Sequence, residues 1–435
     1  MKWILRADHL LPLILLAGVS QYAMIAIDVM KSGGTSLWQL TNDDLDSAGI
    51  LRYVKDCFVV FISCAWLIVL PKLKLPTALI VRIRIYFIWI VGIIFLGTLG
   101  FLFGYSPFTF LPAGLRWILL LHASFGVFIL SSSLVTGLQH HKFIFRCLWL
   151  FLLIDTYAVI LQFITASNLL DLAFGNSRLT GLFSNAGVAA FFSIAIALIS
   201  FQLDGVSLKK RMIITLLSIF LALSSGTRFA STAVFIILLT QMWELTETIN
   251  IKRRFQIKIM FVPMVLLAIF FGYQALVKQV DRGDAITQQL EKGGRVANFF
   301  EFVELLSTAD LGELLVGRGL GIGTNTAIAK NIAEGIDPNL YRFNRLTDNA
   351  LITSIFQFGL IGATLFWTGI YKFIIFVKPK YSKTAKNRYN CIIIIILLTL
   401  MAGSPLEHYF LMMSYATSLG AVYWKDQFAK KLRPA

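Results

Sequence analysis

The stretch from Ile85 to Phe103, IYFIWIVGIIFLGTLGFLF, decides the fold class because it holds no charged residue over a length that can cross a membrane. A hydrocarbon core about 30 Å thick requires roughly 20 consecutive apolar residues in a helix. Similar apolar blocks recur along the chain, separated by short polar stretches. Backbone groups inside a bilayer must be paired within their own segment, so we expect these blocks to be helices. The sequence therefore predicts an all-α integral membrane protein.

The composition agrees with this fold class and bears on the partners. The chain is 57% hydrophobic and only 14% charged, whereas soluble domains carry about 25% charged residues. The net charge of +16 is typical of Lys and Arg gathered in cytoplasmic loops, so we expect no nucleic acid partner. The four cysteines lie in or beside apolar blocks without a CxxC pair, which argues against a zinc site or a disulfide framework.

The alternation of basic and non-basic connections predicts the topology. It favours about 12 transmembrane helices with both termini in the cytoplasm. The apolar pattern stops over 277–348, and we expect this stretch to form a large periplasmic loop between helices 9 and 10. Apolar residues near helical spacing over 286–306 indicate that the loop is a partly helical cap. The whole chain, 1–435, is predicted to be a single polytopic membrane domain.

Arginines and other polar side chains gather at the predicted outer ends of the helices. An arginine close to hydrocarbon needs a partner, and several that converge from separate loops would suit a pyrophosphate, which accepts forked, charge-assisted hydrogen bonds. The candidates are Arg178, Asn185, Arg228, Arg295, Arg318, Arg342, Arg345, Asp348, Asn349, Glu407 and His408.

Each candidate also has a purely structural explanation. A single interfacial arginine can contact lipid headgroups, and the glycine run over 317–324 is either a close-packed turn or a phosphate-binding nest. Asp348 and Asn349 could cap the helix that follows them. Glu407 and His408 could be a loop pair without a role, and His140 and His141 are expected to be interfacial residues only.

Several enzyme classes are disfavoured by missing motifs. The sequence has no Walker motif, no HExxH motif and no clustered His and Cys set, so neither a nucleotide site nor a transition-metal site is expected. The GxSxG motif of a nucleophile elbow is also absent.

Four sequence elements, taken in order, resemble the O-antigen polymerase and ligase superfamily, which includes Wzy-type polymerases and WaaL-type ligases. The first two are RLTGLFSN over 178–185 and LSSGTR over 223–228. The third is Arg295 followed by GRGLGIGT over 317–324, and the fourth is DNALITSIFQFGLIG over 348–362. The resemblance covers roughly residues 178–365.

This resemblance implies a glycosyltransferase of the bacterial cell inner membrane with a periplasmic active site. The implied partners are a donor and an acceptor oligosaccharide carried on undecaprenyl pyrophosphate, together with membrane lipids and a chain-length regulator protein. It assigns the leaving pyrophosphate to Arg178, Arg228 and Arg295, with Arg318 as a further contact. No metal and no other cofactor is expected, because fixed arginine charges would stabilise the leaving group.

One departure from the pattern bears on the choice between the relatives. The ligases typically carry a histidine at the position of Asp348, so an aspartate here favours a polymerase over a ligase. Asp348 is then the candidate that orients or deprotonates the acceptor, Asn349 supports it, and Glu407 and His408 are the reserves. A flippase is the third alternative, but it should place charges midway through several helices and often has duplicated halves. Neither feature is evident in the sequence.

Overall fold

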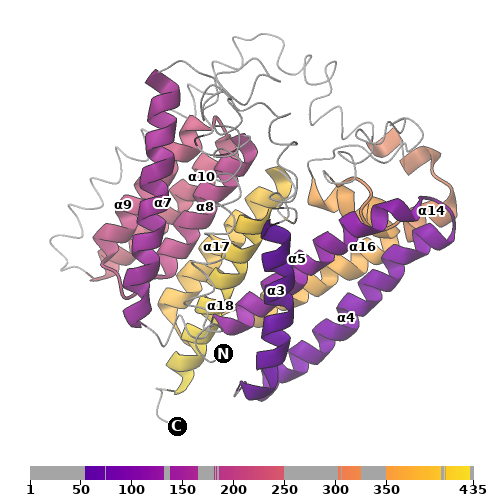
Figure 1. Cartoon of the computed structure of the whole chain (residues 1–435). Helices are drawn as coiled ribbons and strands as arrows, with labels where there is room; N and C mark the ends of the chain where they lie inside the picture. Colours follow the sequence, from indigo (N-terminus) through magenta and orange to yellow (C-terminus); the bar gives the residue numbers. More distant parts are fainter. Residues whose placement is uncertain are drawn as a thin grey trace. The chain divides into compact units, whose positions relative to one another are not determined.

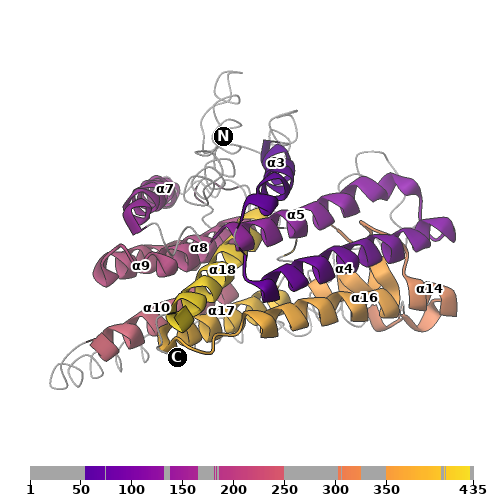
Figure 2. The ribbon, with the colours of Figure 1, turned by 90° about the horizontal axis from the view of Figure 1, so that it is seen from below.

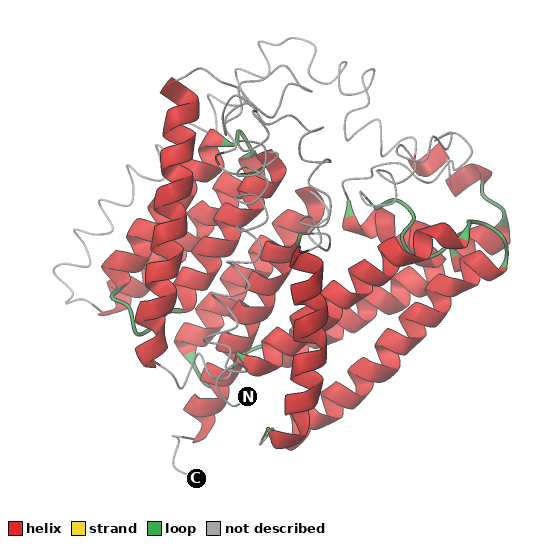
Figure 3. Cartoon of the chain, in the orientation of Figure 1, coloured by secondary structure: helices red, strands yellow, loops and turns green. Residues whose placement is uncertain are grey.

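The computed structural model describes most of the central and C-terminal parts of the chain, and all regular structure there is helical (Figure 3). The described residues are 54–73, 75–131, 138–164, 181, 183, 186–248, 302–304, 306–324, 349–402, 406 and 408–431. Their main helices are α3 (Val54–Val69), α4 (Thr77–Leu102), α5 (Leu111–Leu130), α7 (Leu138–Ile164), α8 (Ala186–Gln202), α9 (Leu208–Ser224), α10 (Arg228–Thr248), α14 (Leu311–Val316), α16 (Ala350–Val377), α17 (Lys383–Ala402) and α18 (Tyr409–Lys431) (Figure 1). Two short 3-10 turns, η2 (Leu70–Lys72) and η3 (Phe108–Phe110), adjoin α3 and α5.

Five of the described helical segments are long and apolar enough to cross a membrane, judged by length and composition. They are Thr77–Leu102, Phe108–Leu130, His141–Ile160, Phe229–Glu247 and Ala350–Val377. The prediction of an all-α protein with membrane-spanning helices is thus confirmed for the described residues. The count of 12 spans stays a prediction, since helices 1 and 9 and most of the 277–348 loop lie outside these residues.

The chain divides into two compact units. Unit 1 comprises Met1–Val91, Leu115–Thr240 and Thr368–Ala435, and unit 2 comprises Gly92–Gly114 and Gln241–Trp367. The predicted single domain over 1–435 stays a prediction, and each unit is described by itself.

Unit 1 is organised around α8. This helix packs against both α9 and α18, and its pairing with α9 is visible from two directions (Figures 1 and 2). Every side chain from Ala189 to Gln202 is buried, as expected for a helix that is apolar on all sides. The hydroxyls of Ser193 and Ser200 donate to the carbonyls of Ala189 and Ala197, each at 2.9 Å, so burying them leaves no hydrogen bond unmade.

In unit 1, one carboxylate of α18 holds the backbone that leads into α17. Asp426, which is 3% exposed, lies near the end of α18 and accepts hydrogen bonds from three consecutive backbone N–H groups just before α17. The donors are Lys380 (2.9 Å), Tyr381 (2.7 Å) and Ser382 (2.8 Å). A carboxylate at this position satisfies N–H groups that the helix cannot bond itself, and it also faces the positive end of the α17 dipole.

Unit 2 is built on a close crossing between the glycine run and α16. Gly359 has φ 64° and ψ −174°, so α16 is interrupted there. The carbonyls of Phe356 and Gln357 accept from the N–H groups of Arg318 (2.8 Å) and Gly319 (3.2 Å). The backbones approach so closely that a Cβ at Gly317 would lie 2.7 Å from the backbone nitrogen of Phe358.

The amides of the glycine run are mostly bonded within the unit. Leu320 N–H donates to Gly97 O of α4 at 2.9 Å, and Gly321 N–H donates to the Gln357 side-chain oxygen at 3.2 Å. Ile322 and Thr324 N–H donate to the carbonyls of Gly319 and Gly321. Of the two explanations weighed for 317–324, this bonding favours the close-packed turn, because a phosphate nest needs its N–H groups directed outward.

The crossing predicts that Gly317 tolerates alanine less well than a glycine of similar positive φ in open space. Gly317 and Gly104 have similar φ values, 81° and 78°, but a Cβ at Gly104 would have no neighbour within 4 Å. Gly104→Ala should lower the free energy of unfolding by about 1 kcal/mol, the cost of a left-handed alanine. Gly317→Ala should lower it by roughly 1–3 kcal/mol more, because it also overpacks the crossing. Thermal unfolding of both variants in detergent measures this difference. Equal losses of stability in the two variants would contradict the close packing at the crossing.

Candidate functional site

Three helices of unit 1 begin at the same end of the unit. Phe191, in the second turn of α8, joins them: its ring lies 4.0 Å from the ring of His408, which immediately precedes α18, and 5.3 Å from Phe229 of α10. Phe192 adds a second contact, 5.2 Å from Phe410 of α18. The N-terminal ends of α8, α10 and α18 therefore come together, and we call this region the N-terminal end of unit 1.

The RLTGLFSN segment reaches the same end. Phe183, which is 1% exposed, packs with its ring 4.6 Å from Phe192 and 6.3 Å from Phe410. Two residues earlier, Gly181 adopts φ 62°, a left-handed conformation that favours glycine. The described part of this segment is thus fixed beside the start of α8.

A carboxylate that the sequence analysis overlooked lies against this segment. Asp155 of α7 is 2% exposed, and a Cβ added to Gly181 would overlap with its Oδ1 atom. Its signal in the sequence was an acidic residue within an otherwise apolar block, and ionisable residues inside membrane helices are usually functional.

The connection between α9 and α10 is a short turn within the LSSGTR segment. Ser225 N–H donates to Leu221 O at 3.0 Å, and Gly226 follows with φ 65°, which ends α9. Arg228 is the first residue of α10. Arg228, which is predicted to bind the pyrophosphate, therefore belongs to one of the three helix ends that come together.

The electrostatics of the N-terminal end of unit 1 favour an anion. The first N–H groups of a helix have no partner within that helix, and its dipole places a partial positive charge there. Three such ends close together would reinforce one another and favour the binding of an anion. Phe183, Phe191, Phe192, Phe229 and Phe410 line the same region and would lower its local dielectric.

Only some of the predicted site residues are among those that the structure describes. Arg178, Asn185, Arg295, Arg342, Arg345, Asp348 and Glu407 lie outside the described residues, as does most of the predicted cap over 277–348. Arg228 and His408 belong to unit 1, whereas Arg318 and Asn349 belong to unit 2. The convergence of all eleven candidates on one site therefore stays a prediction.

The two described candidates of unit 2 have structural partners. Asn349 caps α16: its side-chain oxygen accepts from the N–H groups of Leu351 (2.9 Å) and Ile352 (3.3 Å). Arg318 donates from Nε to Glu313 and forms an ion pair with it. A phosphate bound at Arg318 would therefore have to compete with a resident carboxylate.

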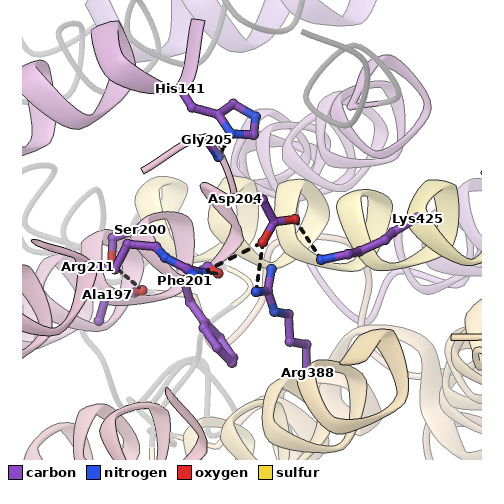
Figure 4. A network of polar contacts seen from close by, with 9 residues as sticks. All are labelled: His141, Ala197, Ser200, Phe201, Asp204, Gly205, Arg211, Arg388 and Lys425. Carbon is purple, nitrogen blue, oxygen red and sulfur yellow. Dashed lines mark hydrogen bonds and ion pairs between the residues drawn. The ribbon is translucent and has the colours of Figure 1, made fainter. Parts of the chain in front are cut away.

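A cluster of charged side chains at the opposite end of α8 was also overlooked (Figure 4). Asp204, in the short turn between α8 and α9, accepts from Arg388 of α17 at 2.8 Å and from Lys425 of α18 at 2.6 Å. Arg211 of α9 lies 3.8 Å from the same carboxylate and donates to Phe201 O at 2.9 Å. The cluster therefore ties α9, α17 and α18 to the C-terminal end of α8.

His141 supports this cluster from α7. Its ring is 1% exposed, and Nδ1 accepts a hydrogen bond from Gly205 N–H at 2.8 Å (Figure 4). His141 therefore has a structural role, because it provides an acceptor for a part-buried N–H group of the turn after α8. The basic residues over 209–211 belong to the first turn of α9.

In the described residues, no three His, Cys, Asp or Glu side chains come together as the ligands of a metal ion. No family model matches the chain, and no curated protein matches its sequence. Conclusions on function therefore come from the chain's own residues and their arrangement.

The Asp204 cluster predicts a pH-dependent contribution to stability. Burial alone would raise the pKa of Asp204, but Arg388, Lys425 and Arg211 together lower it from 3.8 to about 2. A carboxyl whose pKa is lower in the folded state stabilises that state above its unfolded pKa, near 4. This contribution is lost as the pH falls from about 4 toward 2.

We therefore expect Asp204→Asn to unfold at a lower temperature than the wild type at neutral pH, and the gap to narrow below about pH 4. Thermal unfolding as a function of pH measures this difference. Glu304→Gln, which neutralises an exposed carboxylate, is the control and should leave the midpoint nearly unchanged. A gap between Asp204→Asn and wild type that stays constant down to pH 2 would refute the ion-pair account.

Proposed function

We propose that the protein is a Wzy-type O-antigen polymerase. It would join surface-polysaccharide repeat units that are carried on undecaprenyl pyrophosphate, at the periplasmic face of the bacterial inner membrane. The observation that carries the proposal is the convergence of the N-terminal ends of α8, α10 and α18 beside the RLTGLFSN segment. A site that releases a pyrophosphate needs such an electropositive, weakly hydrated environment.

The proposed reaction is an inverting glycosyl transfer. A hydroxyl of the acceptor glycan attacks the anomeric carbon of the donor glycan while the bond to the pyrophosphate oxygen breaks. The hydroxyl proton passes to a base, and lipid pyrophosphate leaves with the bonding electron pair. Negative charge therefore grows on the leaving phosphate, and preorganised positive charge lowers the barrier.

The residue roles follow from the sequence pattern and from the helix ends. Arg178, Arg228 and Arg295 would bind the pyrophosphate, and the first N–H groups of α8 and α10 would add to their field. Asp348 would orient or deprotonate the acceptor, with Asn349 beside it; Glu407 and His408 are the reserves. Because Asn349 caps α16, its contribution would be to fix the start of that helix rather than to react.

The proposal includes a topology. The N-terminal end of unit 1 would face the periplasm, and the Asp204 cluster would lie toward the cytoplasm together with both chain termini. Lys209, Lys210, Lys430 and Lys431 lie near that second end of α8 and α18, as the positive-inside rule expects. Twelve spans and a periplasmic loop over 277–348 complete this topology.

The lipopolysaccharide of a deletion strain, analysed together with its lipid-linked glycans, tests the proposal. A polymerase defect predicts a core capped with a single repeat unit, because ligation continues without polymerisation. Bare core with long polymer left on the lipid carrier would instead identify the WaaL-type ligase. Bare core with single units trapped on the cytoplasmic leaflet would identify a flippase, and an unchanged ladder would overturn all three.

The arginine assignment predicts a large kinetic effect at Arg228. Arg228→Ala should reduce turnover roughly 100- to 1,000-fold, the usual loss when one group that stabilises a transition-state charge is removed. Turnover of purified, folded protein on lipid-linked repeat units is the measurement. Arg84→Ala, which removes an exposed arginine of α4, should retain wild-type turnover. Full activity of Arg228→Ala would refute the assignment of this residue to pyrophosphate.

A further inference from the structure

Asp155 is a buried acidic residue within an apolar helix. It is 2% exposed and lies inside the segment His141–Ile160, which is long and apolar enough to span a membrane. Burying a carboxylate in such a helix is unfavourable, so acidic residues found there usually serve a function. An alanine or leucine would fit the hydropathy of this segment without that cost.

The carboxylate lies directly against the RLTGLFSN segment. A Cβ at Gly181 would overlap with Asp155 Oδ1 and would lie 3.2 Å from Cγ2 of Val159, one turn later on α7. Asp155 and Val159 thus form a surface on which the Gly181 backbone rests. Since Gly181 also has φ 62°, both its conformation and its contact with Asp155 exclude a side chain.

The same segment is held on its other side by Phe183. The Phe183 ring packs against Phe192 of α8 and Phe410 of α18. Two residues separated by a single position are therefore anchored to different helices, Gly181 to α7 and Phe183 to α8 and α18. Such double anchoring fixes the positions of Gly181 and Phe183, which lie just before α8 in the chain.

A carboxylate at this position supplies more than packing. When ionised, it is an acceptor-only group that can bond the backbone N–H groups of a turn. In that form it would also help to orient cationic groups that bind the substrate at this end of unit 1. An amide of the same shape would keep the volume and lose the charge.

We infer that Asp155 is a positioning residue of the transferase site, whose carboxylate fixes the Gly181 turn against α7 and thereby sets the entry into α8. This inference rests on the proposed function. It deepens that function by adding a residue of α7, a helix that none of the four sequence elements includes.

Kinetics of Asp155→Asn and Asp155→Glu in purified protein test the inference. Asp155→Asn should lower kcat at least tenfold while KM for the lipid-linked donor changes less than threefold, because a misplaced site slows the chemical step more than it weakens lipid binding. Asp155→Glu, which keeps the charge, should recover part of the lost kcat. Asp204→Asn is the matched control: it removes a partly buried carboxylate at the opposite end of α8 and should keep kcat within twofold for the folded fraction.

A purely structural role would give a different result. Asp155→Asn would then lower the unfolding temperature and leave kcat within twofold of wild type, which would overturn the inference while the polymerase activity stands. A wild-type protein that does not polymerise repeat units would overturn the proposed function and this inference with it.

A double-mutant cycle tests the contact without any assay of activity. Asp155→Ala opens space beside Gly181, so Gly181→Ala should lower the unfolding temperature less in that background than in the wild type. Additive losses would show that the two residues do not touch and would overturn the inference on structural grounds alone.

Discussion

The structure of unit 1 depends on the burial of α8 from Ala189 to its C-terminal end. With every side chain from Ala189 to Gln202 enclosed, this helix has no exposed face on which to carry polar groups, so its two ends must carry them. At its C-terminal end, Asp204 forms ion pairs with basic side chains of α9, α17 and α18. At its N-terminal end aromatic rings join it to α10 and α18.

The sequence was sufficient for the fold class and for several helix limits because these depend on local composition. The apolar block that follows RLTGLFSN is α8 at Ala186–Gln202, and the glycine-containing turn at LSSGTR separates α9 from α10. Both follow from apolar length and from glycine at the turn. The capping by Asn349 is equally local, since donors and acceptor lie within three residues.

The charged cluster and the glycine crossing were not predictable in this way. Asp204 is 221 residues from Lys425, and nothing in the flanking sequence of either indicates the other. The glycine run left two explanations open because φ angles above zero serve a nest and a close crossing equally well. Only the interruption of α16 at Gly359, which frees carbonyls for Arg318 and Gly319, decides between them. Asp155 went unnoticed because one acid hardly changes the hydropathy of a block.

The direction of α8 and α18 links the two ends of unit 1 to the proposed chemistry. The two helices are parallel, since Phe192 meets Phe410 near their starts and Asp204 meets Lys425 near their ends. Parallel dipoles side by side repel, and opposite charges at each end relieve this repulsion.

At the C-terminal end, basic side chains of the protein itself relieve the repulsion between the two helix dipoles. Arg211 donates to Phe201 O in the last turn of α8, and Lys430 and Lys431 occupy the last turn of α18. At the N-terminal end a bound anion would supply the matching negative charge. A lipid pyrophosphate could supply this negative charge. The substrate of the proposed polymerase would then balance the positive dipole ends of α8 and α18, as arginine and lysine balance their negative ends.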